Sequence, residues 1–351
     1  MFLSFYGLRE QPFGVTPDPR FLYLSPAHKE ALGSLQYGIQ TGLGFFALIA
    51  PPGTGKTTLL LHLLQTFRTS TRTAFLFQTQ CRSREFMRLL VTELGCESAK
   101  GDFAVLHERF NQVLLQEARV GRPVLLIIDE AQNLESSVLE TVRLLSNFET
   151  PTKKLLQIVL GAQPQLAEKL ASPCLSQLRQ RISLWSSLDP LSVAEVKRYI
   201  EHRLHVAGHG GRSLFTPEAL DWIANLSRGI PRVVNNYCLS ALALGFILKQ
   251  STIDLAVINE VAADFGVGNL TPRSNKEIIA TGGTVAVYKQ RNRLPSTSEH
   301  ACVPKTTAGT NCNSTNGLRS ENLPSVVEAQ QYFLYLTKML KTSQTVSRSA
   351  H

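Results

Sequence analysis

The chain of 351 residues is 43% hydrophobic and 18% charged, which is typical of a globular protein and excludes a chain that is disordered throughout. Its net charge of +9 is unevenly placed: residues 1–265 hold 26 basic and 23 acidic side chains (+3), whereas residues 266–351 hold 10 and 4 (+6). The basic character of the last segment is therefore weak evidence that the rest of the chain binds nucleic acid.

The first 30 residues are predicted to be an extended lead segment, because their prolines exclude a helix. A helix is then expected to begin at Pro26, with Ser25 as its N-cap, and to end near Ile39. Strands are predicted at 45–50, 73–78, 124–128, 155–160 and 182–187, with helices at 56–68, 83–94, 103–119 and 135–147. This alternation predicts an α/β fold with a parallel sheet covered on both faces.

A phosphate-binding loop follows the first strand. It reads Ala50-Pro51-Pro52-Gly53-Thr54-Gly55-Lys56-Thr57-Thr58 and opens the next helix, the layout of a Walker A motif. Gly53 and Gly55 allow successive backbone N–H groups to point at one anion, and the helix presents its positive dipole end to the same phosphates. Residues 52–58 (Pro52, Gly53, Thr54, Gly55, Lys56, Thr57 and Thr58) are therefore the candidate nucleotide-binding residues.

Within this loop, Lys56 is expected to bind the β- and γ-phosphates, and the Thr57 hydroxyl to ligate Mg²⁺. One position departs from the motif, because Ala50 stands where glycine is usual. The end of a strand tolerates alanine if φ stays negative, so the departure is expected to have a small effect.

A second motif lies at the end of the apolar strand 124–128, where Asp129 and Glu130 follow five hydrophobic residues. Two adjacent carboxylates at the end of a buried strand are costly unless they serve a site, and ligands of open α/β sheets bind at that edge. Asp129 is expected to hold Mg²⁺, directly or through water. Glu130 is expected to orient and polarise the attacking water, as in a Walker B motif.

Three further features could complete the site. Gln163 follows the fourth strand, Arg179 and Arg181 precede the fifth, and Arg232 lies at the start of a later helix. The amide could hydrogen-bond the water or the γ-phosphate, and arginine suits phosphate oxygens. Each also has a structural explanation: a turn cap for Gln163, a surface ion pair for Arg179 or Arg181, and an exposed helix start for Arg232.

From residue 192 the pattern is helical, with a helix expected after Thr216 and two more at 231–248 and 252–264. Beyond 266 the polar, Gly- and Pro-rich composition predicts disorder over 267–323, with one amphipathic helix at 324–342. His202, His205 and His209 have metal-ligand spacing, but Gly208 and Gly210 indicate that the helix has ended, so a solvated helix face is expected.

Six cysteines lie at 81, 96, 174, 238, 302 and 312. None forms a Cys-x-x-Cys pair, which excludes a zinc module and is typical of a reducing cytosol. The amino terminus has no basic-then-apolar leader. The longest apolar stretch, Cys238–Leu248, has 11 residues and is too short to cross a bilayer. We therefore expect a cytoplasmic protein with no transmembrane span.

In combination these motifs resemble the AAA+ ATPases, and more narrowly the ExeA-like family (general secretion pathway protein A). The narrower resemblance covers about residues 4–265 and is carried by Tyr6–Phe13, Thr16–Pro26, Asp129-Glu130-Ala131-Gln132, Gly161-Ala162-Gln163-Pro164-Gln165-Leu166 and Gly229–Arg232. It implies a P-loop NTPase sheet of strand order 5-1-4-3-2 with a helical lid. The implied organisation is a lead and adenine-pocket helix (1–40), an α/β ATPase domain (41–190), a helical lid (191–265) and a basic tail (266–351).

The resemblance also implies roles for single residues. Gln163 takes the place of the sensor-1 residue, where many AAA+ proteins carry Asn, and Arg232 that of sensor 2, which reads the γ-phosphate. Either Arg179 or Arg181 is the finger that reaches the ATP of a neighbouring subunit, which implies a homo-oligomer, a ring or a filament. Segment 13–24 and the helix at 25–39 are expected to wall the adenine.

The expected function is ATP hydrolysis to ADP and phosphate with Mg²⁺, coupled to assembly or remodelling of a protein partner in the cell envelope. Secretion members typically continue into a transmembrane helix and a periplasmic peptidoglycan-binding domain, whereas this tail is polar and span-free, which weakens that role. A DNA-dependent ATPase regulator resembling transposition ATPases is the alternative, motivated by the basic tail and by Arg82, Arg84 and Arg88. A nucleotide-switched scaffold with little turnover is a third hypothesis.

Overall fold

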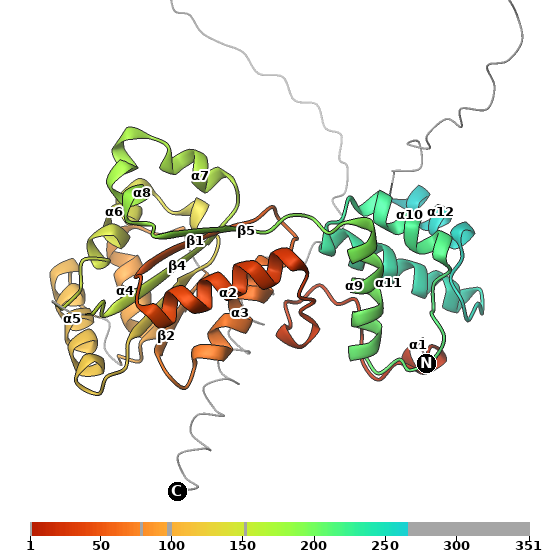
Figure 1. Ribbon diagram of the computed structural model, residues 1–351, viewed down its shortest axis with the longest axis horizontal. Coiled ribbons are helices and arrows are strands. Elements are labelled where there is room, and N and C mark those ends of the chain that lie inside the picture. Colours follow the sequence, from red (N-terminus) through yellow and green to blue (C-terminus); the bar gives the residue numbers. More distant parts are fainter. Residues whose placement is uncertain (1, 78–79, 97–99, 151–152, 266–351) are drawn as a thin grey trace, which may run out of the picture. The chain divides into compact units, whose positions relative to one another are not determined.

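The computed structural model describes residues 2–77, 80–96, 100–150 and 153–265 (Figure 1). The predicted disorder at 267–323 and the predicted helix at 324–342 lie outside the described residues. Among the helices described, none is both long and apolar enough to cross a membrane.

Five parallel strands form the sheet at the centre of the α/β part (Figure 1). They are β1 Phe45–Ile49, β2 Arg72–Leu76, β3 Val124–Ile128, β4 Leu156–Ala162 and β5 Leu184–Ser187. Their spatial order is β2-β3-β4-β1-β5, which confirms the expected order 5-1-4-3-2. Every residue of β3 is buried, which agrees with the prediction from its continuous apolar run. Every residue of β4 is buried as well, Gln157 included.

Helices cover both faces of this sheet. On one face, α4 (Ser83–Glu93), α5 (Phe103–Arg119) and α6 (Ser136–Leu145) share a buried cluster with Phe45 and Ala47 of β1. On the other face lie α2 (Pro26–Thr41) and α3 (Lys56–Phe67). There Gly38 of α2 approaches the Phe46 ring so closely that a Cβ at this glycine would lie 2.4 Å from a ring carbon.

Several short elements were not predicted. Helices α7 (Gln165–Leu170) and α8 (Ser176–Arg181) have six residues each, too few for a helical hydrophobic period to stand out. The expectation of a lead segment without any helix was wrong. A single turn, α1 (Phe2–Phe5), precedes the first proline, and a 3₁₀ turn, η1 (Pro19–Phe21), begins at a proline, where the missing N–H costs nothing.

The helical part consists of α9 (Val193–Val206), α10 (Pro217–Ser227), α11 (Pro231–Ile247) and α12 (Leu255–Asp264). Its core includes Tyr6, Leu8 and Phe13 of the lead segment, and the Tyr6 hydroxyl donates to the Leu242 carbonyl at 3.0 Å. The first residues of the chain therefore pack in the core of helices far along the sequence, since Tyr6 and Leu242 are 236 residues apart, and Figure 1 shows α1 beside these helices.

The three histidines near the end of α9 differ partly from expectation. The helix ends at Val206, so His209 leaves its face, and its ring instead bonds the Tyr6 and Arg212 carbonyl oxygens. The expected solvated face is wrong for His202, which is half-buried with its ring centroid 5.7 Å from that of Tyr23. The apolar environment also lowers the pKa of His202, since burial disfavours the charged ring.

Candidate nucleotide-binding site

The Walker A loop connects β1 to α3 with the backbone that its glycines allow. Gly53 and Gly55 have φ of 83° and 100°, and Gly55 immediately precedes the first residue of α3. Ala50 is not among the described residues with positive φ, and its N–H donates to the Ala162 carbonyl of β4 at 2.9 Å. The alanine therefore fits because the strand ladder continues through it. Within the loop, the Thr54 hydroxyl donates to the Pro51 carbonyl at 2.8 Å.

A buried ionic network joins this loop to the end of β3. Lys56 and Asp129 are 5% and 3% exposed, and the Lys56 ammonium contacts the Asp129 carboxylate and lies 2.9 Å from Glu130 Oε1. The Thr57 hydroxyl donates to the other Asp129 oxygen at 2.6 Å. Buried charges are tolerated only when they are paired and hydrogen-bonded, and each of these groups is. The residues expected to bind phosphate and metal thus lie together.

Glu130 is held by two amides as well as by Lys56. Its Oε2 accepts from Gln132 Nε2 at 2.6 Å and from Gln163 Nε2 at 3.0 Å, while Gln132 Oε1 accepts from the Gln163 backbone N–H at 3.1 Å. Burial by itself would raise the pKa of Glu130, but the hydrogen bond and charge of Lys56 and the two amides together lower it. The carboxyl group is therefore ionised at neutral pH.

Gln132 was not assigned a role from the sequence, although it lies in the quoted run Asp129–Gln132. Its amide accepts with one end and donates with the other, so it fixes Gln163 and Glu130 relative to each other. The signal that could have identified Gln132 is its polar side chain in the short 3₁₀ turn that follows the Walker B strand.

The start of α11 lies directly over the phosphate loop. The Arg232 N–H donates to the Gly53 carbonyl at 3.1 Å, and a Cβ at Gly53 would lie 2.9 Å from Arg232 Cβ. Gly229 makes this approach possible, because its φ is 71° and the Leu191 N–H donates to its carbonyl at 2.8 Å. The expected sensor-2 arginine is therefore at the pocket, with an exposed side chain.

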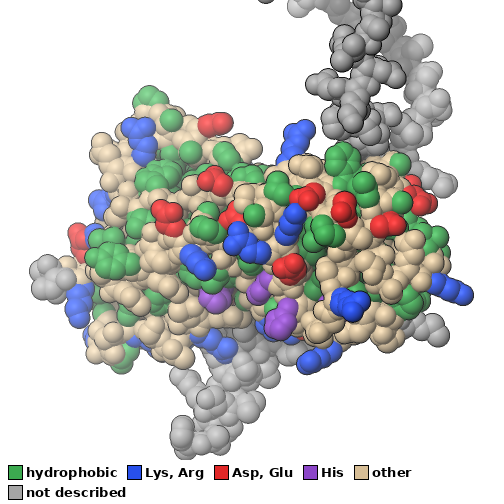
Figure 2. All heavy atoms as spheres, turned by 45° about the vertical axis from the view of Figure 1, so that its right-hand side comes forward, with side chains coloured by type: hydrophobic (Ala, Val, Ile, Leu, Met, Phe, Trp, Pro, Cys, Tyr) green, Lys and Arg blue, Asp and Glu red, His purple; other side chains and the backbone are tan. Residues whose placement is uncertain are grey.

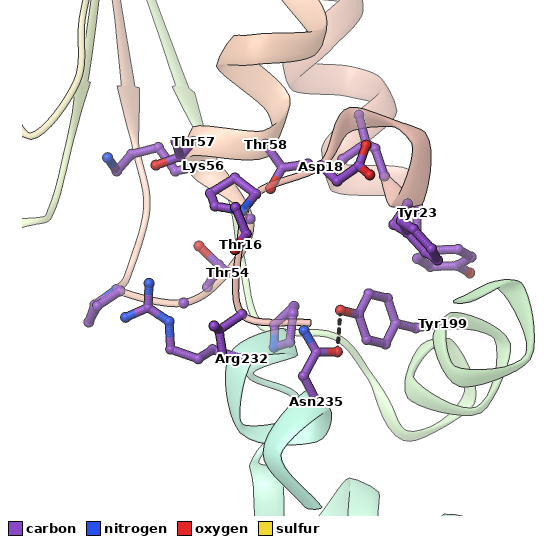
Figure 3. Close-up of a pocket in the computed structure, with 18 of the residues that line it drawn as sticks. Thr16, Asp18, Tyr23, Thr54, Lys56, Thr57, Thr58, Tyr199, Arg232 and Asn235 are labelled. Carbon is purple, nitrogen blue, oxygen red and sulfur yellow. Dashed lines mark hydrogen bonds between the residues drawn. The ribbon is translucent and has the colours of Figure 1, made fainter. Parts of the chain in front are cut away.

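A pocket of about 340 Å³ lies between the phosphate loop, the lead segment and the helical part (Figure 3). The loop supplies residues 51–58, the lead segment supplies residues 14–18 and 21–23, and Tyr199, Arg203 and Asn235 come from α9 and α11. Glu130 and Gln163 also line it. The lead segment therefore lines the pocket, and its role in walling the adenine stays a prediction. Tyr199, Arg203 and Asn235 were not singled out as site residues.

His28 of α2 was also missed, and it supports the loop from behind. This residue is 3% exposed; its Nδ1 lies 2.8 Å from the Ser25 hydroxyl and its Nε2 lies 3.1 Å from the Thr54 carbonyl. Burial lowers the pKa of His28, although its bond to the Thr54 carbonyl acts in the opposite direction. The neutral ring therefore donates to the carbonyl through Nε2 and accepts from the serine hydroxyl.

Arg179 and Arg181 lie on α8, and neither is among the residues that line the pocket. Arg179 is exposed and Arg181 is half-exposed, with Glu149 as an electrostatic neighbour. The described part of the chain does not bring either arginine to its own pocket. Arg82, which caps the start of α4, and Arg84 and Arg88 within the helix are exposed. The Arg84 guanidinium donates to the Gly101 carbonyl at 3.1 Å.

Comparison with known solved structures shows the same fold. The Aeropyrum pernix ORC2 protein, in its ADPNP–ADP complexes, superposes with a TM-score of 0.56 at 12% identity, over 73% of this chain and 72% of that one. Cdc6p from Pyrobaculum aerophilum gives a TM-score of 0.54 at 15% identity, over 71% of each chain. At such identities the likeness concerns the fold alone.

Sequence comparison is more specific. Residues 39–170 match the model of an AAA domain. General secretion pathway protein A of Aeromonas hydrophila is 41% identical over 247 residues, which is 70% of this chain but 45% of that protein, so the chain spans less than half of its relative. The chain is therefore similar to an AAA domain over residues 39–170 and, over 70% of its length, to general secretion pathway protein A, as an ExeA-like protein.

Proposed function

We propose that the chain binds ATP with Mg²⁺ in the pocket over the phosphate loop and hydrolyses it to ADP and phosphate. The observation that carries this proposal is the buried network of Lys56, Thr57, Asp129, Glu130 and Gln163. It gathers a cation, a hydroxyl and two carboxylates at the edge of the sheet where the loop's glycines leave room for an anion.

These groups fit both the nucleotide and the metal. A side chain on Gly53 would meet Arg232, and one on Gly55 would lie 3.2 Å from His28 Nε2, so the loop is closely surrounded and needs glycines. The Thr57 hydroxyl and the Asp129 carboxylate offer the hard oxygen ligands that Mg²⁺ prefers. When bound there, Mg²⁺ would neutralise negative charge on the phosphates.

Each of these side chains would then have a separate role in hydrolysis. Phosphate oxygens compete with Asp129 and Glu130 for the Lys56 ammonium, so nucleotide binding releases Glu130 Oε1 from its 2.9 Å contact. The released carboxylate would accept a hydrogen bond from the attacking water and later its proton, while Gln132 and Gln163 hold the other carboxylate oxygen. Arg232 would reach the γ-phosphate from α11.

We infer that the active form is a homo-oligomer in which Arg179 or Arg181 reaches the neighbour's nucleotide. Support comes from the position of both arginines outside their own pocket and from their exposure. Hydrolysis would drive assembly or remodelling of a protein partner, as a general secretion pathway A-like protein. We place this activity in the cytoplasm, because the four described cysteines are free thiols, as expected in a reducing compartment.

Phosphate release measured with wild type and with Glu130→Gln, over a range of protein concentrations, tests the proposal. We expect Glu130→Gln to bind ATP but to lose about 10²- to 10⁴-fold in turnover. Glu135→Gln is the matched control, because Glu135 is an exposed carboxylate just outside the site. Turnover by Glu130→Gln within twofold of wild type would refute the assigned role.

A mixing experiment tests the oligomer. An arginine variant (Arg179→Ala or Arg181→Ala) keeps Glu130 but lacks the finger, and Glu130→Gln keeps the finger but lacks the carboxylate. If the finger acts in trans, with a contribution of about 10³- to 10⁵-fold, mixtures of the two inactive proteins regain activity. Absence of any recovery for both arginines would contradict the trans assignment.

The same assay with duplex DNA addresses the DNA-dependent alternative. On the face drawn in Figure 2, Lys and Arg side chains alternate with Asp and Glu and form no continuous basic patch. A protein partner, as proposed above, predicts no stimulation by DNA. Stimulation that weakens steeply with salt, as counterion release requires, would favour the alternative.

A further inference from the structure

A chain of three buried polar side chains ends at the pocket. Arg203 Nη1 donates to the Tyr199 hydroxyl oxygen at 3.0 Å, and the Tyr199 hydroxyl lies 2.8 Å from Asn235 Oδ1. Arg203, Tyr199 and Asn235 are 9%, 5% and 8% exposed, and all three line the pocket. Arg203 is itself anchored, because its Nε donates to the Pro12 carbonyl and its guanidinium lies 4.8 Å from the Phe21 ring centroid.

The direction of these hydrogen bonds is fixed by chemistry. Arginine can only donate, so the Tyr199 oxygen accepts from Arg203, and the Tyr199 hydroxyl donates its single proton to Asn235 Oδ1. An acceptor is needed there, which places the amide oxygen of Asn235 towards Tyr199 and its NH₂ group on the other side. Figure 3 shows this arrangement, with the amide nitrogen of Asn235 turned away from Tyr199.

The pocket has two chemically different ends. The phosphate loop and Lys56 form one end, and the other is bounded by Phe21, Tyr23 and Tyr199, of which Tyr23 and Tyr199 lie edge to face with centroids 6.1 Å apart. Arg232 bonds the loop and Asn235 follows one turn later on the same face of α11, next to the aromatic end. A planar base suits that end, since aromatic rings stack on it and charged phosphates do not.

We propose that Asn235 donates a hydrogen bond through Nδ2 to a ring nitrogen of the nucleotide's adenine, and that Tyr199 and Arg203 are positioning residues that hold the amide in this orientation. This inference rests on the proposed function, because it assumes that the nucleotide's phosphates occupy the loop. A buried donor that the correct base satisfies penalises any ligand that lacks the acceptor, so the relay contributes specificity as well as affinity.

Calorimetric titration of the full chain with ADP and with inorganic pyrophosphate tests the assignment. In Asn235→Leu we expect ADP affinity to fall about tenfold to a hundredfold and pyrophosphate affinity to stay within twofold. Asn236→Leu is the matched control, because Asn236 is the neighbouring residue and is exposed. Tyr199→Phe, which keeps the ring, is expected to lose less, and its loss should not add to that of Asn235→Leu.

Wild-type protein titrated with 1-, 3- and 7-deaza-ADP tests the atom without any variant. One of the three analogues should bind as weakly to wild type as ADP binds to Asn235→Leu, and Asn235→Leu should not distinguish that analogue from ADP. Equal binding of all three analogues and ADP to wild type, or unchanged ADP affinity in Asn235→Leu, would overturn the inference. Wild type that binds neither ADP nor pyrophosphate would overturn the proposed function with it.

Discussion

Replacing Gly229 by alanine tests how the helical part is joined to the phosphate loop. Gly229 is a buried residue between α10 and α11, and its φ of 71° lies in the left-handed region. A Cβ at this position would lie 1.9 Å from the Leu191 carbonyl oxygen, whereas real Cβ atoms essentially never approach closer than 3.0 Å. The alanine must therefore push the start of α11 away from the segment that precedes α9.

Two other glycines separate the contributions to the cost. Gly33, exposed in the middle of α2, has neither positive φ nor an atom within 4 Å of a Cβ, so Gly33→Ala should stabilise by about 0.5–1 kcal/mol. Gly7 has φ of 65° and the same open space, so Gly7→Ala should cost only the left-handed strain of about 1–2 kcal/mol. Gly229→Ala adds to that strain the loss of the buried Leu191–Gly229 hydrogen bond, about 1–3 kcal/mol.

The expected total for Gly229→Ala is therefore about 2–5 kcal/mol of destabilisation. Urea unfolding of the three variants and wild type, with the midpoint and the slope fitted together, measures these differences. The informative result is the order: Gly229→Ala least stable, then Gly7→Ala, then wild type, then Gly33→Ala. A Gly229→Ala protein no less stable than Gly7→Ala would refute the reasoning, because the clash would then cost nothing.

Three further predictions concern buried polar groups. The pKa of His28 in the folded protein lies below its ordinary value of about 6.5, so the free energy of unfolding should fall as the pH drops below the ordinary value. His28→Gln should remove this part of the pH dependence in urea unfolding at pH 5–8. A pH profile of the variant that matches wild type would contradict the prediction. Gln157 is 2% exposed and accepts from the Gly44 N–H at 2.9 Å, so Gln157→Leu should cost about 1–3 kcal/mol in the same assay. Arg203→Lys should lower the free energy of unfolding in urea by more than Lys197→Met does. Lys197→Met is the control, because it breaks only the partly exposed ion pair with Asp221 and should cost less than about 1 kcal/mol. Equal losses of the two variants would argue against a special role for the Arg203 guanidinium.

The sequence predicted the parts of the site that are formed by consecutive residues. The run 50–58 has glycines where its backbone needs positive φ, and the five apolar residues before Asp129 define their own strand. The strand order could not be predicted in this way, because no local pattern in the sequence determines which strand pairs with which. The expected order came instead from the family resemblance. Short helices such as α7 and α8 lie below the length at which periodicity is informative.

The aromatic end of the pocket could not be predicted for a related reason. Tyr199 has the spacing of an ordinary core residue on α9, and Asn235 on α11 belongs to no recognisable sequence motif. Their meaning depends on Phe21 and Pro12, nearly 200 residues away, which meet them only once the lead segment has packed into the helical core. His28 is hidden in the same way, since its partner Thr54 lies in another element.

The backbone of Glu130 adds an argument that this edge of the sheet is a functional site and not a structural loop. Its φ of 54° lies in the left-handed region, where a residue with a long side chain costs about 1–2 kcal/mol that glycine would not. Such strain persists only where surrounding contacts over-determine it, and Lys56, Gln132 and Gln163 all bind this one carboxylate. A turn that served only to leave β3 would be more stable with glycine, so a glutamate here costs stability, which the proposed role in orienting water would explain.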